Sequence, residues 1–225
     1  MSLEKKIYWG VGIFSFVVIF GAFLIPGDRP EQEDLPWHIE HPTPDSVRIF
    51  GLTLGQSTSA QAEARFKEQA EPSLFKSPEG KLAAELFFEQ VNLAGLRSRI
   101  VLTADIPETE LHTMYERGLR MAGTGSGKKI TLTPEDVERL RATPISSLTY
   151  MPGVKVDEML FKKRFGEPQQ IIKERKSGAI HWLYPQHGLD ITLGGSEKPV
   201  LQYVAPAQFS KLIQPLLENG ERLTP

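Results

Sequence analysis

The most apolar stretch of the chain runs from Ile7 to Ile25 and contains no charged residue. A helix needs about twenty such residues to cross the hydrocarbon core of a bilayer. A helix buried in a soluble domain normally keeps a polar face, and this stretch has none. It ends in Pro26-Gly27 without the small residues of a signal-peptide cleavage site. The pattern therefore predicts residues 7–25 as a retained transmembrane helix, in contact with membrane lipid.

The charges on either side of this stretch predict its orientation. Lys5 and Lys6 precede it, whereas mostly acidic residues follow it, among them Asp28 and Glu31. Basic residues stay on the cytoplasmic side of a membrane. We therefore expect residues 1–6 to form a cytoplasmic tail and the rest of the chain to lie outside. In a bacterium this describes an inner-membrane protein whose bulk is periplasmic.

Residues 26–45 form a segment rich in proline and in acidic residues, which is typical of a stiff, extended linker. Its centre, from Leu35 to Ile39, is more apolar and contains Trp37. This short island has two interpretations. It is either a strap that packs on the edge of the following domain or a segment on which a partner docks.

The pattern from residue 46 to 106 predicts a first αβ module. Residues 47–54 alternate as a strand does, and Ser57 or Ser59 can cap a helix that ends near Lys67. Residues 82–91 and 96–104 read as a hairpin, since apolar and polar positions alternate cleanly in its second arm.

Residues 107–144 are predicted to form a helical bridge with a glycine-rich loop. Apolar spacing favours a helix over residues 107–121, and the glycines of residues 123–129 favour a loop. Thr133 followed by Pro134 and two acidic residues is a strong helix start, so a second helix is expected to end near Arg141.

Residues 145–210 predict a second αβ module, followed by a C-terminal helix and tail over residues 211–225. A helix over residues 156–165 is ended by Gly166 and Pro168. Strands are expected at residues 169–173, 179–184, 189–193 and 200–204, and the last helix at about residues 208–218.

The two predicted modules share a pattern of short motifs about 95 residues apart. Arg65-Phe66 and Glu71-Pro72 in the first correspond to Arg164-Phe165 and Glu167-Pro168 in the second. A helix on a small antiparallel sheet buries only one face, so two such modules can pack their sheets or helices together to complete a core. The expected fold class is therefore α+β, with one N-terminal transmembrane helix and two tandem helix-on-antiparallel-sheet modules.

The second module, from Leu148 to Tyr203, carries a helix that ends in Arg164-Phe165-Gly166-Glu167-Pro168 and then a strand with Trp182-Leu183-Tyr184. It resembles the small helix-plus-sheet fold of the SmpA/BamE lipoproteins. The two-module arrangement is similar to the secreted β-lactamase-inhibitor proteins. Both resemblances imply an extracytoplasmic binding protein without catalytic activity. The first module departs from the pattern because Lys67 stands where the helix-ending glycine is expected, and the lipoprotein cysteine is missing.

Composition narrows the possible partners and cofactors. The formal net charge of −2 gives no electrostatic case for nucleic acid. The chain has no cysteine, so it has no disulfide, no thiol chemistry and no thiolate metal site. The glycine-rich run 122–129 lacks the first glycine and the hydroxyl residue of a phosphate-binding loop. Neither nucleotide nor any other cofactor is expected.

Catalytic and metal-binding residues give no pattern either. The five histidines are His38, His41, His112, His181 and His187, and a metal site needs three or four converging ligands, which their spacing does not supply. There is no Gly-x-Ser-x-Gly nucleophile elbow. No catalytic residue and no metal ligand is therefore assigned.

Aromatic residues in the two hairpins are the best candidates for contact with a partner. Alternation places Phe87 and Phe88 on opposite faces of one strand, so one faces the core and the other is free to line a groove. Trp182 and Leu183 alternate in the same way, and burial of the whole aromatic group between the modules is the alternative. The candidate partner contacts are Trp37, Phe88, Trp182 and Tyr184.

These features together favour a non-catalytic periplasmic protein that binds other proteins or serves as an assembly subunit of a membrane or envelope complex. The features are the predicted membrane anchor, the linker, the repeated scaffold and the lack of a catalytic motif. Its partners would be proteins of the membrane or periplasm. The alternative is an envelope hydrolase whose carboxylate or histidine site the sequence does not identify.

Overall fold

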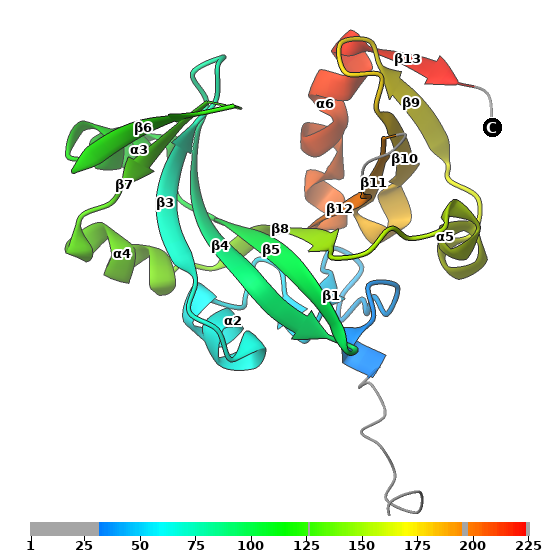
Figure 1. Cartoon of the computed structure of the whole chain (residues 1–225), viewed down its shortest axis with the longest axis horizontal. Helices are drawn as coiled ribbons and strands as arrows, with labels where there is room; N and C mark the ends of the chain where they lie inside the picture. The colour runs from blue at the N-terminus through cyan, green and yellow to red at the C-terminus, as the bar shows by residue number, and fades with distance from the viewer. Residues whose placement is uncertain (1–31, 126, 195–197, 224–225) are drawn as a thin grey trace, which may run out of the picture. The chain divides into compact units, whose positions relative to one another are not determined.

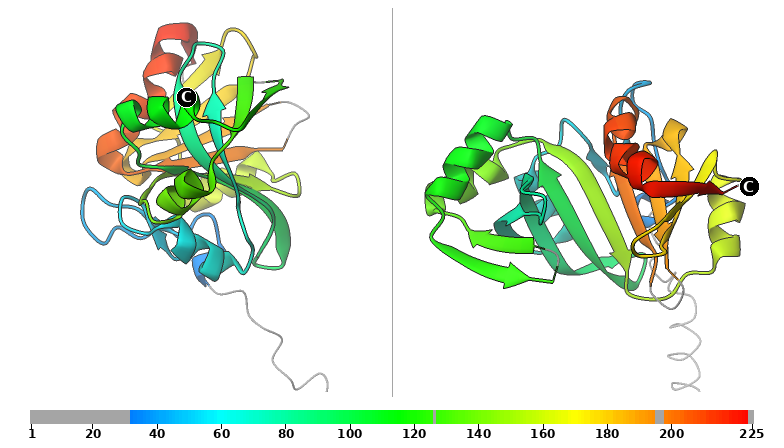
Figure 2. Two further views of the ribbon diagram at one scale, coloured as in Figure 1. Left: turned by 90° about the vertical axis from the view of Figure 1, so that its left-hand side faces the viewer. Right: turned by 90° about the horizontal axis from the view of Figure 1, so that it is seen from above.

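A computed structural model describes residues 32–125, 127–194 and 198–223 (Figures 1 and 2). The predicted tail at residues 1–6 and the predicted transmembrane helix at residues 7–25 lie outside this range. Within it, no helix combines the length and the apolar character that crossing a bilayer requires.

A long antiparallel sheet dominates the described part of the chain. It has eleven strands in the order β13-β9-β10-β11-β12-β8-β5-β4-β3-β7-β6, and each pairs antiparallel with its neighbours. The mixed helix and sheet composition with antiparallel pairing confirms the predicted class. The strands are β3 (Glu71–Lys76), β4 (Leu82–Leu93), β5 (Leu96–Ala104), β6 (Arg120–Thr124), β7 (Gly127–Thr131), β8 (Ile145–Pro152), β9 (Gln170–Glu174), β10 (Ile180–Tyr184), β11 (Leu189–Leu193), β12 (Val200–Val204) and β13 (Gly220–Leu223).

The helices divide between the two faces of this sheet. Helices α2, α3, α4 and α5 contribute buried residues to the main core, which lines one face. Helix α6 instead forms a separate cluster on the opposite face, over β9, β10 and β12 (Figure 1). The helices are α2 (Ser59–Phe66), α3 (Glu108–Glu116), α4 (Pro134–Arg141), α5 (Glu158–Phe165) and α6 (Phe209–Asn219), with short 3-10 turns η1 (Gln32–Asp34), η2 (Pro185–His187) and η3 (Pro206–Gln208).

Strands β5 and β8 join the two halves of the chain directly. Ile100 lies opposite Tyr150 and Leu102 opposite Leu148, and all four side chains belong to the main core. The first half (residues 46–144) and the second half (residues 145–223) therefore share one sheet and one main core.

A tight hairpin of β1 (Arg48–Ile49) and β2 (Leu52–Thr53) adds to this core. Its turn residues Phe50 and Gly51 both have positive φ, at 52° and 78°. Positive φ is unusual for a bulky residue. Here it places the fully buried Phe50 ring 5.1 Å from that of Tyr150. Aromatic burial of this kind outweighs a backbone cost of about 1–3 kcal/mol.

Each half carries an aromatic pair between its helix and its sheet. In the first, the Phe66 ring at the end of α2 meets Phe88 of β4 edge-on, with ring centroids 5.2 Å apart. In the second, Phe165 at the end of α5 lies 5.6 Å from Tyr184 of β10. These are the phenylalanines of the Arg-Phe motifs that the sequence comparison of the two halves aligned.

Four local predictions are wrong. The cap of α2 is Thr58, which lies between Ser57 and Ser59, the two residues predicted for this role. The predicted loop at residues 123–129 is the β6–β7 hairpin, in which Met121 lies opposite Ile130. The helix predicted to reach residue 121 ends at Glu116, because Gly118 breaks it and the chain then enters β6. The strand predicted over residues 47–54 is interrupted by the Phe50-Gly51 turn. The sequence patterns also missed β3, β8 and β13.

The described part of the predicted linker, residues 32–45, lies against the domain, as the strap interpretation requires. The carboxylate of Asp34 accepts a hydrogen bond from Arg65 of α2 at 2.7 Å. The Tyr203 hydroxyl donates to the Pro36 carbonyl oxygen at 2.7 Å. Ile39 packs on the main core.

Candidate interaction surface

One face of the sheet remains partly exposed across the middle of the molecule. The strand register places Phe87, Val101, Thr149 and Gln202 directly opposite one another on β4, β5, β8 and β12. Their side chains alternate with core residues and point away from the main core. We call this surface the open face and define it as the half-buried residues Phe75, Glu85, Phe87, Val101, Thr103, Thr149, Met151 and Gln202.

The chemistry of the open face differs from that of the core beneath it. Phe87, Val101 and Met151 are apolar, whereas Thr103, Thr149 and Gln202 offer hydrogen-bonding groups. Aromatic residues and methionine are enriched in protein interfaces, and an apolar centre with polar neighbours is typical of them. Contiguous exposed apolar surface of this type marks an interaction site more often than chance.

Glu85 is the carboxylate within this surface. It lies opposite Thr103 and Ser73 on the neighbouring strands. Burial raises its pKa, and the nearby Lys129 opposes that shift only in part. Burial of the ionised carboxylate lowers the free energy of unfolding. A partner that donates hydrogen bonds to this carboxylate would offset the loss.

Charged residues surround the open face. Arg99 is exposed and lies directly opposite Met151. At the other end, Lys129 of β7 forms an ion pair with Glu71 of β3, with 2.7 Å between nitrogen and oxygen. Rim charges of this kind steer encounter more than they add affinity.

Helix α6 limits the open face on the second half of the sheet. Phe209 and Ile213 of this helix pack on Leu183 and Val204, which the register places on the same face as Gln202. Leu183, which directly precedes Tyr184 in β10, is fully buried. Phe87, which directly precedes Phe88 in β4, is the corresponding residue of the first half and is only half-buried.

The four predicted contact residues fall mostly into the core. Phe88 and Tyr184 are fully buried, and Trp182 is 6% exposed. A partner cannot reach Phe88 or Tyr184 in this structure, so these two candidates require correction. Alternation had identified the right pair of faces, but Phe87, not Phe88, lies on the open one. The Arg-Phe motif of α2 could have indicated this, because its Phe66 packs on Phe88 and so leaves Phe87 on the open face.

Trp37 is half-buried and belongs to an apolar pocket beside the strap. Arg164 of α5 lies over the Trp37 ring, 4.7 Å from its centroid. The pocket has a volume of about 230 Å³ and is walled mainly by apolar side chains, among them Leu93, Leu96 and Val154. Trp37 thus lines this pocket, and its contact with Arg164 holds residues 32–45 against the domain.

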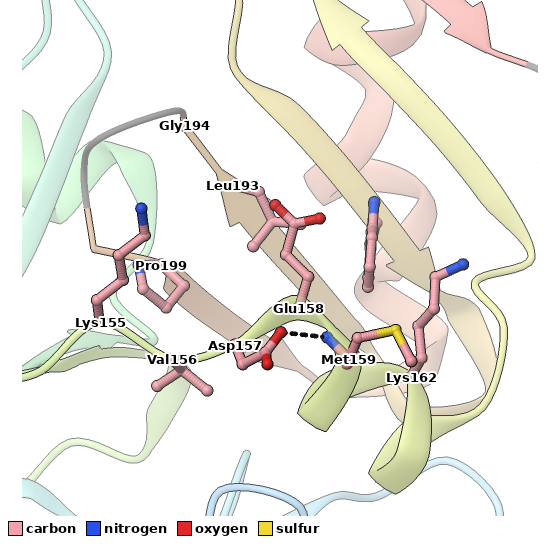
Figure 3. Close-up of a pocket in the computed structure, with 10 residues that line it drawn as sticks. Lys155, Val156, Asp157, Glu158, Met159, Lys162, Leu193, Gly194 and Pro199 are labelled. Carbon is pink, nitrogen blue, oxygen red and sulfur yellow. Dashed lines mark hydrogen bonds between the residues drawn. The ribbon is translucent and has the colours of Figure 1, made fainter.

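A wider depression lies beside α5 (Figure 3). Trp182 is one of the residues that line it. This depression has a volume of about 630 Å³, and Lys162 lies over the Trp182 ring at 5.4 Å. Figure 3 also shows the Asp157 carboxylate, which accepts a hydrogen bond from the Met159 backbone N–H at 2.9 Å and caps α5. Met159 is 70% exposed at the rim. Four charged residues are among those that line the depression: Lys155, Asp157, Glu158 and Lys162.

The histidines do not assemble a metal site. His41 Nε2 lies 3.3 Å from His187 Nδ1, where the strap crosses η2. Burial, together with His41, lowers the pKa of His187, which favours a neutral imidazole at this contact. Within residues 32–223, apart from the segments the structure leaves undescribed, no three histidines or carboxylates converge as metal ligands.

One histidine and carboxylate pair bears on the hydrolase alternative. His181 Nδ1 lies 2.9 Å from Asp190 Oδ2, and the Thr192 hydroxyl approaches the same nitrogen at 3.3 Å. A catalytic triad needs the nucleophile at the second nitrogen of the imidazole, with the carboxylate on the first. Asp190 takes the position of the triad carboxylate on Nδ1. The Thr192 hydroxyl approaches this same nitrogen, and within the described residues no hydroxyl pairs with Nε2, where the nucleophile belongs.

Comparisons with models of protein families, with curated proteins and with solved structures gave no match. The resemblances found in the sequence therefore gain no support from them.

Proposed function

We propose that this chain is a non-catalytic protein-binding subunit, and that its partner contacts the open face. In this proposal residues 7–25 anchor it in the bacterial inner membrane, with residues 1–6 in the cytoplasm and the sheet in the periplasm. The observation that carries the proposal is the partial exposure of Phe87, Val101 and Met151 on the same sheet face that α6 buries farther along.

The packing around the open face favours a binding role over a merely solvated surface. A sheet face that only meets water usually carries charged and polar residues in alternation with the core. Here an aromatic, a β-branched and a thioether side chain occupy those positions instead. Their exposure costs the isolated chain about 25 cal/mol per Å² of apolar area, which a partner would remove from water.

We further propose that the two halves arose from one αβ module. The support is the matched order of a capped helix, its terminal phenylalanine and the aromatic residue that this phenylalanine meets in the sheet: Phe66 with Phe88, and Phe165 with Tyr184. In this view α6 is an addition to the second module, and the partner takes the corresponding place over the first.

A matched pair of methionine substitutions tests the proposed function. Met151→Asp introduces a charge into the open face, where Arg99 lies opposite and can accommodate it. Met159→Asp makes the same change in the first turn of α5, where a carboxylate is favourable. Both full-length proteins would be purified from membranes in mild detergent, with their companions identified by mass spectrometry.

We expect the same companion protein with the unaltered chain and with Met159→Asp, and at least about tenfold less of it with Met151→Asp. Urea unfolding should show that both variants are as stable as the unaltered protein to within about 1 kcal/mol. Equal recovery with the two variants, or a chain that purifies alone in every case, would contradict the proposal.

A further inference from the structure

The sheet ends at β6, and this edge is open. All five residues from Arg120 to Thr124 are exposed, and within the described residues β6 pairs only with β7. In an antiparallel edge strand, alternate residues direct their backbone N–H and C=O groups outward. A Cβ atom built onto Gly123 would meet no atom within 4 Å, so the sheet face above this residue is open.

The two edges of the sheet are protected to different degrees. At the other edge, the four residues of β13 include the exposed charges of Glu221 and Arg222. Charged residues, prolines and bulges are the usual means of preventing unwanted strand pairing. Strand β6 has no proline and one charge, Arg120. It is therefore the less protected edge.

Apolar residues accompany the unpaired backbone of β6. Leu119 is 64% exposed and Met121 is 46% exposed. They stand two positions apart, so both point to the same face of the sheet. An added strand would bring its own alternate side chains next to them, which is how strand addition gains specificity beyond backbone hydrogen bonds.

The charge around this edge has one sign. Residues 117–133 include four basic residues and no acidic one. Arg117 is paired with the buried Asp136, and Lys129 with Glu71. Within the described part of the chain no carboxylate pairs with Arg120 or Lys128, so these two cations remain available to an incoming segment.

We propose that β6 accepts an extended acidic segment of another protein, which adds to the sheet as a further strand. Its residues would alternate between apolar side chains, packed on Leu119 and Met121, and carboxylates on the opposite face near Arg120. Lys128, which lies opposite Gly123 on the Met121 face, adds to the positive charge that attracts this segment. A second copy of this chain offers less charge complementarity, because its own β6 carries Arg120 and no carboxylate. This site is separate from the open face and goes beyond the function proposed above.

Synthetic peptides test the proposal. The probe is an acetylated, fluorescently labelled peptide of alternating valine and acidic residues, and its counterpart carries lysine at each acidic position. Binding to the full-length protein would be followed by fluorescence anisotropy, and the site by amide chemical-shift changes. We expect the acidic peptide to bind and to shift resonances of residues 119–131, and the lysine peptide not to bind.

Two further comparisons separate strand addition from simple charge attraction. The double variant Arg120→Glu and Lys128→Glu should weaken the acidic peptide by at least about tenfold. N-methylation of alternate peptide bonds blocks one edge of the peptide, so one of the two possible methylation patterns should abolish binding and the other preserve it.

Several results would overturn the proposal. These are no binding of the acidic peptide, equal binding of the lysine peptide, no effect of the double variant, or equal binding of both methylated forms. Self-association of the chain that the double variant abolishes would show instead that a second copy occupies β6. Met151→Asp should leave peptide binding unchanged, so failure at the open face and failure at β6 are distinguishable.

Discussion

The two halves of the sheet are built alike on one face and differ on the other. On the core face, each half packs a short helix through a terminal phenylalanine onto an aromatic residue of the sheet. On the opposite face, α6 covers Leu183 in the second half, whereas the matching Phe87 of the first half stays partly exposed. The difference shows that the packing of the core face is common to both halves, whereas coverage of the opposite face is not.

This comparison explains why burial alone does not define the interaction surface. The main core extends through both halves, and Phe87, Val101 and Met151 are not among its members. In the second half, α6 buries the same face of the sheet by packing on Leu183 and Val204. The first half lacks such a helix, and under the proposed function a partner covers its open face.

The largest expected effect contrasts the covered and uncovered positions directly. Leu183→Ala removes a fully buried side chain beneath α6 and should lower the free energy of unfolding by about 2–5 kcal/mol. Phe87→Ala, at the matching half-buried position, should cost about 1–2 kcal/mol although the side chain is larger. Urea unfolding of both full-length variants measures the difference. Equal costs would mean that Phe87 is as much a core residue as Leu183.

The helix ends provide the next comparison. Gly166 at the end of α5 has φ 79° and ψ −168°, a conformation essentially restricted to glycine, so Gly166→Ala should cost about 1–3 kcal/mol. Lys67 at the end of α2 has φ 55° and ψ 32°, the left-handed region that other residues can reach. Lys67→Ala should therefore change stability by less than about 0.5 kcal/mol. Thermal unfolding of the two variants checks this, and a neutral Gly166→Ala would contradict it.

The smallest expected effect concerns Glu85 and depends on pH. Burial raises the folded-state pKa of Glu85, so the folded protein is penalised once this carboxylate ionises. Glu85→Gln should leave stability unchanged below the unfolded-state pKa, about 4.3. As pH rises from the unfolded-state pKa through the folded-state pKa, the variant should become the more stable protein, and the full difference is reached above the folded-state pKa. Urea midpoints measured from pH 4 to pH 7 test the sign, and a variant that is less stable at pH 7 would refute it.

The sequence predicted the parts of the fold that depend on strong local signals. Thr133 with Pro134 marked α4, and alternation in residues 96–104 marked β5, both close to their observed bounds. The glycine-rich β6–β7 hairpin was mistaken for a loop, because glycine signals a turn but carries no alternation to reveal the strands around it. The pairing of β5 with β8 joins positions about fifty residues apart, and no local pattern encodes it.

The open face was only partly accessible to sequence reasoning. Alternation correctly placed Phe87 and Phe88 on opposite faces, but the choice between them depends on where α2 packs. Exposure of Val101 and Met151 depends on how far α6 reaches across the sheet, which is a tertiary property. The β6 edge could not be foreseen, since its strand was not predicted.

The most direct measurement of the central claim is site-specific photocrosslinking in intact cells. A photoreactive amino acid would replace Met151 on the open face, and in a matched protein it would replace Met159 on α5. The account predicts a crosslink to one partner protein from position 151 and none to that partner from position 159. A crosslink from position 159 with none from position 151 would show that the open face is not the contact surface.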